Sequence, residues 1–172
     1  HYMVHFQEPG VADAALAHDV GRVFTQLVRR GVPREESAAA LAAFGRMPTM
    51  VEMVERDGAF GLPLLTADEL AVYVEAFTRT GFTGGINWYR NLDRNWETTP
   101  HLDAARIEVP ALMVTAEWDA ALPPELAGPM RALVSDLELH AIPACGHWTP
   151  QEKPAELNAI LADWLGQRFG TT

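Results

Sequence analysis

The amino-acid sequence predicts an α/β fold, in which a helical region comes before the end of a mostly parallel sheet. Residues 9–80 place apolar side chains mainly at helical spacing, whereas residues 108–170 alternate two predicted strands with two predicted helices. Two parallel strands do not make a stable open sheet by themselves. We therefore expect further strands from residues before His1, and we expect this chain to begin in the middle of a domain.

The first region is expected to hold a long helix and then a shorter one over residues 35–44. Gly31 and Pro33 are expected to end the long helix. Residues 48–63 follow no clear period, so we expect them to be irregular. The long helix is predicted from apolar residues that share one helical face, namely Leu16, Val20, Val23, Phe24 and Leu27.

A further helix is predicted after residue 66. Thr66 and Glu69 form the T-x-x-E pattern of a capping box, and apolar residues then recur at helical spacing until Gly81, which is expected to close the helix. Residues 81–107 contain many Gly, Asn, Trp and Arg residues and are expected to be rich in loops.

The last region is predicted to be a strand–helix–strand–helix unit. The apolar run 109–114 is typical of a parallel strand covered on both faces. A helix is expected over residues 123–134 and a second strand over residues 137–142. Thr149 and Glu152 form another capping-box pattern, which predicts the start of the closing helix.

Two candidate catalytic residues follow the predicted strands. Asp119 lies just after the first strand, and Gly146 and His147 lie just after the second. Ligands of open α/β sheets gather at the carboxyl ends of strands, and an imidazole that titrates near neutral pH is suited to act as a general base. The alternatives are a turn cap for Asp119 and a surface histidine for His147. An acid and then a histidine on successive strand ends is the chain order of the last two triad members in α/β-hydrolases, which favours the catalytic interpretation.

A nucleophile is not apparent. The sequence has no G-x-S-x-G motif, and its only serines, Ser37 and Ser135, lie in unsuitable contexts. Because the nucleophile precedes the acid in this chain order, we expect it upstream of His1.

Two tyrosines are further candidates. Tyr89 lies in a segment rich in Gly, Asn and Trp, and Tyr2 lies at the start of the chain. A phenol in a pocket can hydrogen-bond an oxygen atom and protonate it as that atom becomes an alkoxide. The alternative is that both rings only pack against other side chains.

Composition excludes several classes of partner. The formal net charge of −10, without a cluster of Lys or Arg, makes nucleic acid and anionic membrane surfaces poor partners. No apolar run reaches the length of about 18 residues that a membrane span needs. The single cysteine, Cys145, cannot form an internal disulfide, which fits a reducing, cytoplasmic location.

Five sequence motifs are distinctive when taken together. They are F-Q-E-P-G at 6–10, G-F-x-G-x-x-N-W-Y-R-N at 81–91, R-N-W at 94–96, P-A-L-M-V-T-A-E-x-D at 110–119 and G-H-W-T at 146–149. Together they resemble the motifs of soluble-type epoxide hydrolases of the α/β-hydrolase superfamily. The resemblance implies a partial α/β-hydrolase fold, with residues 1–98 as a helical lid, residues 99–172 as the C-terminal part of the core, and the N-terminal half of the core missing.

The resemblance also implies roles. An upstream Asp would attack a small hydrophobic epoxide and form an ester, while Tyr2 and Tyr89 hold and protonate the epoxide oxygen. His147 would activate the water that hydrolyses the ester to a vicinal diol, and Asp119 would orient His147. No metal and no cofactor is implied, a homodimer is allowed, and this chain is expected to be inactive without the missing half. The substrate pocket would include Trp88, Trp118 and Trp148.

Two alternatives stay open. A haloalkane or haloacid dehalogenase has the same fold, nucleophile and base, but holds a halide ion with Trp or Asn donors instead of tyrosines. A hydrolase-like binding protein without a nucleophile is the second alternative, because a fold alone does not establish chemistry.

Overall fold

The structure is a computed structural model that describes residues 1–46, 48–58, 61–102 and 105–170. It divides into two compact units, one of residues 1–29 with 39–103 and one of residues 30–38 with 104–172. Residues 30–38, which the sequence places within the first region, therefore group with the second unit. Within the described ranges, no helix is long and apolar enough to cross a membrane.

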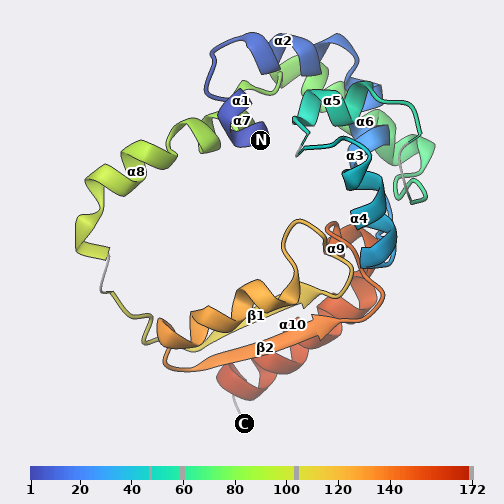
Figure 1. Ribbon diagram of the computed structural model, residues 1–172. Coiled ribbons are helices and arrows are strands. Elements are labelled where there is room, and N and C mark those ends of the chain that lie inside the picture. The colour runs from blue at the N-terminus through green and yellow to red at the C-terminus, as the bar shows by residue number, and fades with distance from the viewer. Residues whose placement is uncertain (47, 59–60, 103–104, 171–172) are drawn as a thin grey trace. The chain divides into compact units, whose positions relative to one another are not determined.

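The first unit is helical (Figure 1). Its helices are α1 (Tyr2–His5), α2 (Val11–His18), α3 (Val20–Leu27), α5 (Met50–Glu55), α6 (Ala67–Thr80), α7 (Thr83–Arg90) and α8 (Leu92–Thr98), with a 3₁₀ turn η1 (Pro100–Leu102) and part of α4 (Arg34–Ala42).

The predicted long helix is in fact two helices, α2 and α3. The chain breaks at Asp19, whose backbone is extended (φ −143°, ψ 85°) and whose carboxylate accepts a hydrogen bond of 2.8 Å from the N–H of Arg22. Asp competes with the helical backbone in this way and so starts a second helix. The apolar face itself is confirmed, because Leu16, Val20, Val23 and Phe24 are buried.

The prediction that residues 48–63 are irregular is wrong over α5. Thr49 and Glu52 form a capping box, in which the N–H of Thr49 donates to Glu52 Oε2 at 2.7 Å and the N–H of Glu52 donates to Thr49 Oγ1 at 3.2 Å. The T-x-x-E pattern was therefore present in the sequence, but the helix that it starts is too short to show a period.

The predicted helix after Thr66 is confirmed as α6. Thr66 and Glu69 form the capping box, and Gly81 ends the helix with φ 67°. Phe77 of α6 packs against Phe24 of α3, with ring centroids 4.8 Å apart, so this pair of aromatic rings joins the two helices.

The expectation of loops over residues 81–107 is wrong, because α7 and α8 occupy most of this range. Gly84 and Gly85 weaken the helical pattern of the sequence. Burial of Phe82 and Ile86, which lie four residues apart, compensates, and Phe82 contacts Phe77 with ring centroids 5.0 Å apart.

The second unit contains a two-stranded parallel sheet, as predicted. Strands β1 (Ala111–Ala116) and β2 (Leu137–Ile142) pair from Ala111 with Leu137 to Ala116 with Ile142. Helix α10 (Pro154–Phe169) packs on this sheet (Figure 1). The core consists of Ala116, Ile142 and Cys145, with Val114, Leu157 and Ile160 packed against it.

One local prediction in the second unit is confirmed and another is wrong. The helix expected over residues 123–134 is present as a 3₁₀ helix, η2 (Pro124–Ala132), in which Pro129 lacks the N–H that an α-helical bond needs. The capping box at Thr149 does not form, because Trp148 is the N-cap of the short helix α9 (Thr149–Glu152), and Lys153 separates α9 from α10.

Candidate active site

The two parallel strands end in register, so the segments that follow them start from one edge of the sheet. Backbone hydrogen bonds join these segments: the N–H of Glu117 donates to the carbonyl of Ile142 at 3.1 Å, and the N–H of Trp118 donates to the carbonyl of Cys145 at 2.8 Å. The N–H of Ala144 donates to Glu117 Oε2 at 2.8 Å. The two strand-end segments are therefore held together along most of their length.

Asp119 and His147 meet at this edge. His147 Nδ1 lies 2.9 Å from Asp119 Oδ2. Asp119 Oδ1 accepts hydrogen bonds from the backbone N–H groups of Ala121, at 2.9 Å, and Leu122, at 3.0 Å. Because a carboxylate only accepts hydrogen bonds, Nδ1 is the donor, and a neutral imidazole then offers Nε2 as its proton acceptor.

The environment favours the charged form of both partners. Burial acts to raise the pKa of Asp119, which is 7 % exposed, but hydrogen bonds from His147 and from the backbone of Leu122 and Ala121 outweigh it and lower that pKa. The hydrogen bond to Asp119 raises the pKa of His147, against burial. The pair is therefore arranged to orient an imidazole and to stabilise it when it gains a proton.

A buried carboxylate supports the histidine segment. Glu152 Oε2 accepts hydrogen bonds of 3.0 Å from the backbone N–H groups of Gly146 and Gly31. A Cβ on Gly146 would lie 2.5 Å from the Cα of Gly31, so the two backbones approach as closely as glycines allow. The sequence assigned Glu152 to a capping box with Thr149; its carboxylate instead binds these two segments, and the Thr149 hydroxyl donates to the carbonyl of Gly146 at 3.3 Å.

The two candidate tyrosines lie together in the first unit. Tyr2 of α1 and Tyr89 of α7 pack edge to face, with ring centroids 5.4 Å apart and an interplanar angle of 84°. Burial, and then a hydrogen bond with the Tyr89 side chain, raise the pKa of Tyr2. The Tyr2 phenol is therefore in its neutral, proton-donating form over the ordinary range of pH.

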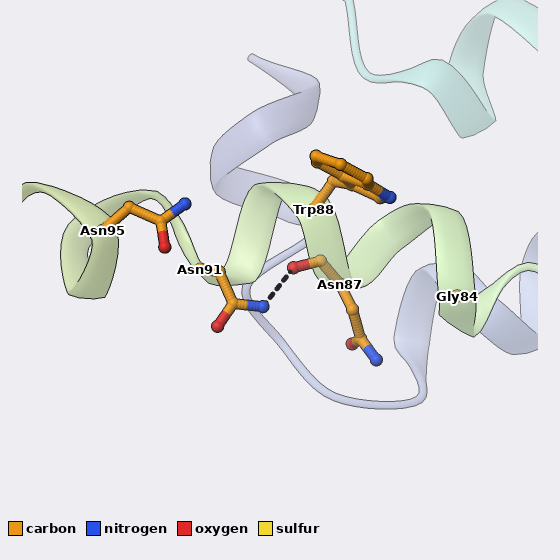
Figure 2. Close-up of a pocket in the computed structure, with 5 residues that line it drawn as sticks. All are labelled: Gly84, Asn87, Trp88, Asn91 and Asn95. Atoms are coloured by element: carbon orange, nitrogen blue, oxygen red, sulfur yellow. Dashed lines mark hydrogen bonds between the residues drawn. The ribbon is translucent and has the colours of Figure 1, made fainter.

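The three tryptophans are divided between the units. Trp148 packs edge to face on His147, with ring centroids 5.5 Å apart, and Trp118 is half-buried in the strand-end segment before Asp119. Trp88 is 80 % exposed and lines an open pocket of about 310 Å³ in the first unit (Figure 2). The other residues of that pocket are Gly84, Asn87, Asn91 and Asn95.

The structure thus brings Asp119 to His147 and Tyr2 to Tyr89, each pair within one unit. Sequence reasoning did not find the supporting role of Glu152, and it passed over Arg90, whose position directly after Tyr89 was the available signal. Among the described residues, no group of His, Cys, Asp and Glu side chains is arranged to hold a metal ion.

The chain is similar to curated epoxide hydrolases. It is 37 % identical over 174 residues to "Epoxide hydrolase A" of Mycobacterium tuberculosis and 38 % identical over 172 residues to "Bifunctional epoxide hydrolase 2" of Sus scrofa, with 95 % of the chain covered in both cases. It spans 51 % of the mycobacterial protein and 29 % of the porcine one. No protein-family model matches the chain.

Solved structures give the same result. The crystal structure of epoxide hydrolase A from Mycobacterium thermoresistibile matches with a TM-score of 0.79 and 38 % identity, over 96 % of this chain and 51 % of that one. An epoxide hydrolase from an endophytic Streptomyces matches with a TM-score of 0.81 and 30 % identity, over 97 % of this chain and 52 % of that one. The similarity therefore covers nearly all of this chain and about half of each solved structure.

Proposed function

Because the chain is homologous over 95 % of its length to epoxide hydrolases, and has about half of their α/β-hydrolase fold, we propose that the protein containing it hydrolyses small hydrophobic epoxides to vicinal diols. The observation that carries the proposal is the hydrogen bond of 2.9 Å between His147 and the buried Asp119 at the common strand edge. In this proposal residues 1–98 belong to a lid and residues 99–172 to the core.

The first chemical step opens the ring. A carboxylate oxygen of an Asp outside this sequence attacks one epoxide carbon, the bond from that carbon to the epoxide oxygen breaks, and an ester forms. Tyr2 and Tyr89 donate hydrogen bonds to the epoxide oxygen, and one phenol gives it a proton as negative charge develops there. The contact between the two rings and the hydrogen bond between their side chains support this role, because they place the two phenol groups next to each other.

The second step hydrolyses the ester. His147 Nε2 takes a proton from water as the water oxygen attacks the ester carbonyl, and the imidazolium returns that proton to the diol oxygen as it leaves. Hydrolysis leaves the nucleophilic Asp as a carboxylic acid. Its proton returns to the phenolate that ring opening produced, so both the carboxylate and the tyrosine phenol are restored. Asp119 holds His147 in the tautomer that this step needs, and it stabilises the transient imidazolium.

A dehalogenase is the second candidate. The observation that favours it is the packing of Trp148 on His147, with ring centroids 5.5 Å apart, because an indole N–H near the base could hold a halide ion. Styrene oxide and 1-chlorobutane, offered separately to the whole protein, distinguish the two. Diol formation without chloride release supports the epoxide hydrolase, and chloride release without diol formation contradicts it.

The role of His147 has a sharper test. With His147→Gln, the ester is expected to form and to persist, so mass spectrometry of the whole protein should find an adduct heavier by the mass of the epoxide. A matched control is His140→Gln, because His140 Nε2 also lies near a carboxylate, 2.7 Å from Glu138, but on the strand itself. The control is expected to turn over normally; normal turnover by His147→Gln would refute the proposed base.

A further inference from the structure

Arg90 is the residue after Tyr89, and its guanidinium binds the loop that follows Tyr2. Arg90 Nε donates to the backbone carbonyl of Phe6 at 2.8 Å, and Nη2 donates to the carbonyl of Glu8 at 3.3 Å. One side chain therefore ties the end of α7 to the chain just beyond α1. Each of these two helices carries one of the paired phenols.

Asp13 of α2 completes this arrangement. Arg90 Nη2 lies 2.9 Å from Asp13 Oδ2, and both side chains are only 17 % exposed. Asp13 also accepts hydrogen bonds from the Thr83 hydroxyl and from the N–H of Gly10, the latter at 3.2 Å. The hydrogen bonds from Thr83 and Arg90 lower the pKa of Asp13, so this carboxylate is ionised near neutral pH.

Phe6 connects this pair to the two tyrosines, because Arg90 binds its backbone and its ring packs on both tyrosine rings. Its ring is 2 % exposed and packs on Tyr2 and on Tyr89, with centroid separations of 5.6 Å and 5.3 Å. Gln7 also joins α1 to α7, because its Nε2 donates hydrogen bonds to the carbonyl of Met3, at 2.9 Å, and to the carbonyl of Tyr89, at 3.1 Å. Arg90 thus holds the backbone of Phe6, and the ring of Phe6 packs on both of the tyrosine rings, which also contact each other.

We propose that Arg90 and Asp13 are a positioning pair that fixes the two phenols, Tyr2 and Tyr89, relative to each other through Phe6. The pair is not catalytic, since it contacts neither phenol oxygen. The inference rests on the proposed function for its catalytic consequence. Its physical basis is that donors to a developing alkoxide act only when held within about 0.5 Å of the productive geometry.

Arg22 provides a matched control in the same unit. Its guanidinium also binds two backbone carbonyls, those of Val54 and Glu55, both at 2.8 Å, and a carboxylate, that of Asp57, at 2.9 Å. Arg22 joins α3 to the end of α5 and contacts neither tyrosine helix. Replacing either arginine with lysine keeps one positive charge but removes the planar fork that reaches several acceptors together.

The first experiment needs no catalysis and uses the whole protein. Its tyrosines are ring-labelled for NMR, and the signals of Tyr2 and Tyr89 are assigned by their loss in Tyr2→Phe and Tyr89→Phe. Arg90→Lys is expected to move the titration of Tyr2 to lower pH, because the phenol loses burial and its contact with Tyr89. Arg22→Lys is expected to leave it unchanged. An unchanged Tyr2 titration in Arg90→Lys, or an equal shift in Arg22→Lys, would overturn the proposal.

The second experiment follows ring opening in the whole protein. In a single turnover with styrene oxide, Arg90→Lys should slow ester formation by about 10- to 100-fold, the cost of misplacing a reacting group, and leave ester hydrolysis unchanged. If the whole protein does not act on epoxides, the proposed function fails, but the tyrosine titration still tests the positioning. If Arg90→Lys does not fold, Asp13→Asn replaces it, with the same expected shift and the same contradicting result.

Discussion

Glu152 Oε2 lies 3.0 Å from the backbone nitrogen of Gly146, so a buried carboxylate directly supports the residue that precedes His147. The same oxygen binds the N–H of Gly31, 121 positions away in the sequence. A four-residue helix, α9, therefore contributes to the placement of the base through its last side chain.

Removing this carboxylate should destabilise the second unit. Glu152→Ala leaves two largely buried N–H groups without their acceptor, and we expect it to lower the free energy of unfolding by about 2–4 kcal/mol, whereas Glu152→Gln keeps one acceptor oxygen and should cost less. Urea denaturation measures both. Glu156→Ala, which removes an exposed carboxylate of α10, is the control and should change stability by less than about 0.5 kcal/mol. Equal losses for Glu152→Ala and Glu156→Ala would contradict this role.

Because the backbones of Gly146 and Gly31 approach closely, we expect that Gly146 cannot be replaced by a residue with a side chain without a loss of stability. Gly146→Ala would place a Cβ 2.5 Å from the Cα of Gly31, and we expect a loss of about 1–3 kcal/mol because backbone must move to relieve the overlap. Gly128→Ala is the matched control, since a Cβ there meets nothing within 4 Å. Thermal unfolding of the two variants should differ clearly, and similar melting temperatures would show that the segments can separate at little cost.

Ala144 has a left-handed backbone, with φ 47°, two residues before Gly146. A β-branched side chain is strained in this conformation, so Ala144→Val should lower the free energy of unfolding by roughly 1–2 kcal/mol, and Ala144→Gly should not. The control is Ala141→Val in β2, at an exposed position where a branched side chain suits a strand. Chemical denaturation of all three variants provides the comparison. A stable Ala144→Val would mean that residue 144 can leave its left-handed conformation freely.

Asp119→Asn should alter both titration and turnover. The hydrogen bond and charge of Asp119 raise the pKa of His147, so the variant should titrate His147 at lower pH by NMR. In the whole protein, turnover should fall on the order of 10⁴-fold, because an amide can hold the wrong imidazole tautomer. Asp163→Asn, at an exposed position of α10, is the control. A His147 titration equal to that of the native chain would contradict the coupling.

The same pair predicts a pH dependence of stability. The pKa of Asp119 is lowered on folding, so its contribution is present above the ordinary value of 3.8 and is lost as the pH falls through the folded value. The pKa of His147 is raised, so its contribution is present below the ordinary value of 6.5 and is lost as the pH rises through the folded value. The stability difference between the native chain and Asp119→Asn should therefore be largest between these two ordinary values. A difference that does not vary with pH would be inconsistent with the ion pair.

Much of the fold could be predicted because its signals are local. The α/β class, the two parallel strands and the capping box at Thr66 are confirmed, and the predicted homology to epoxide hydrolases is confirmed over 95 % of the chain. The errors at α5, α7 and α8 are segments of six to eight residues, which are too short to show a helical period. Asp19 divides the predicted long helix into α2 and α3, although its apolar face was correctly identified, and the helix expected over residues 123–134 is the 3₁₀ helix η2.

The sequence by itself determined the order Asp119 then His147 after two parallel strands, since strand ends and chain order are properties of the sequence. It also made Tyr2 and Tyr89 candidates, because Tyr89 lies within a motif and Tyr2 lies just before one. Tertiary structure alone decided that Glu152 binds Gly31 and Gly146, and that Arg90 binds Asp13 and the loop after Tyr2. The physical reason is that partly buried polar side chains bind the groups that the folded chain places beside them. Apart from Gly146, these partners lie 77 to 121 positions away in the sequence, which leaves no local signal of the choice.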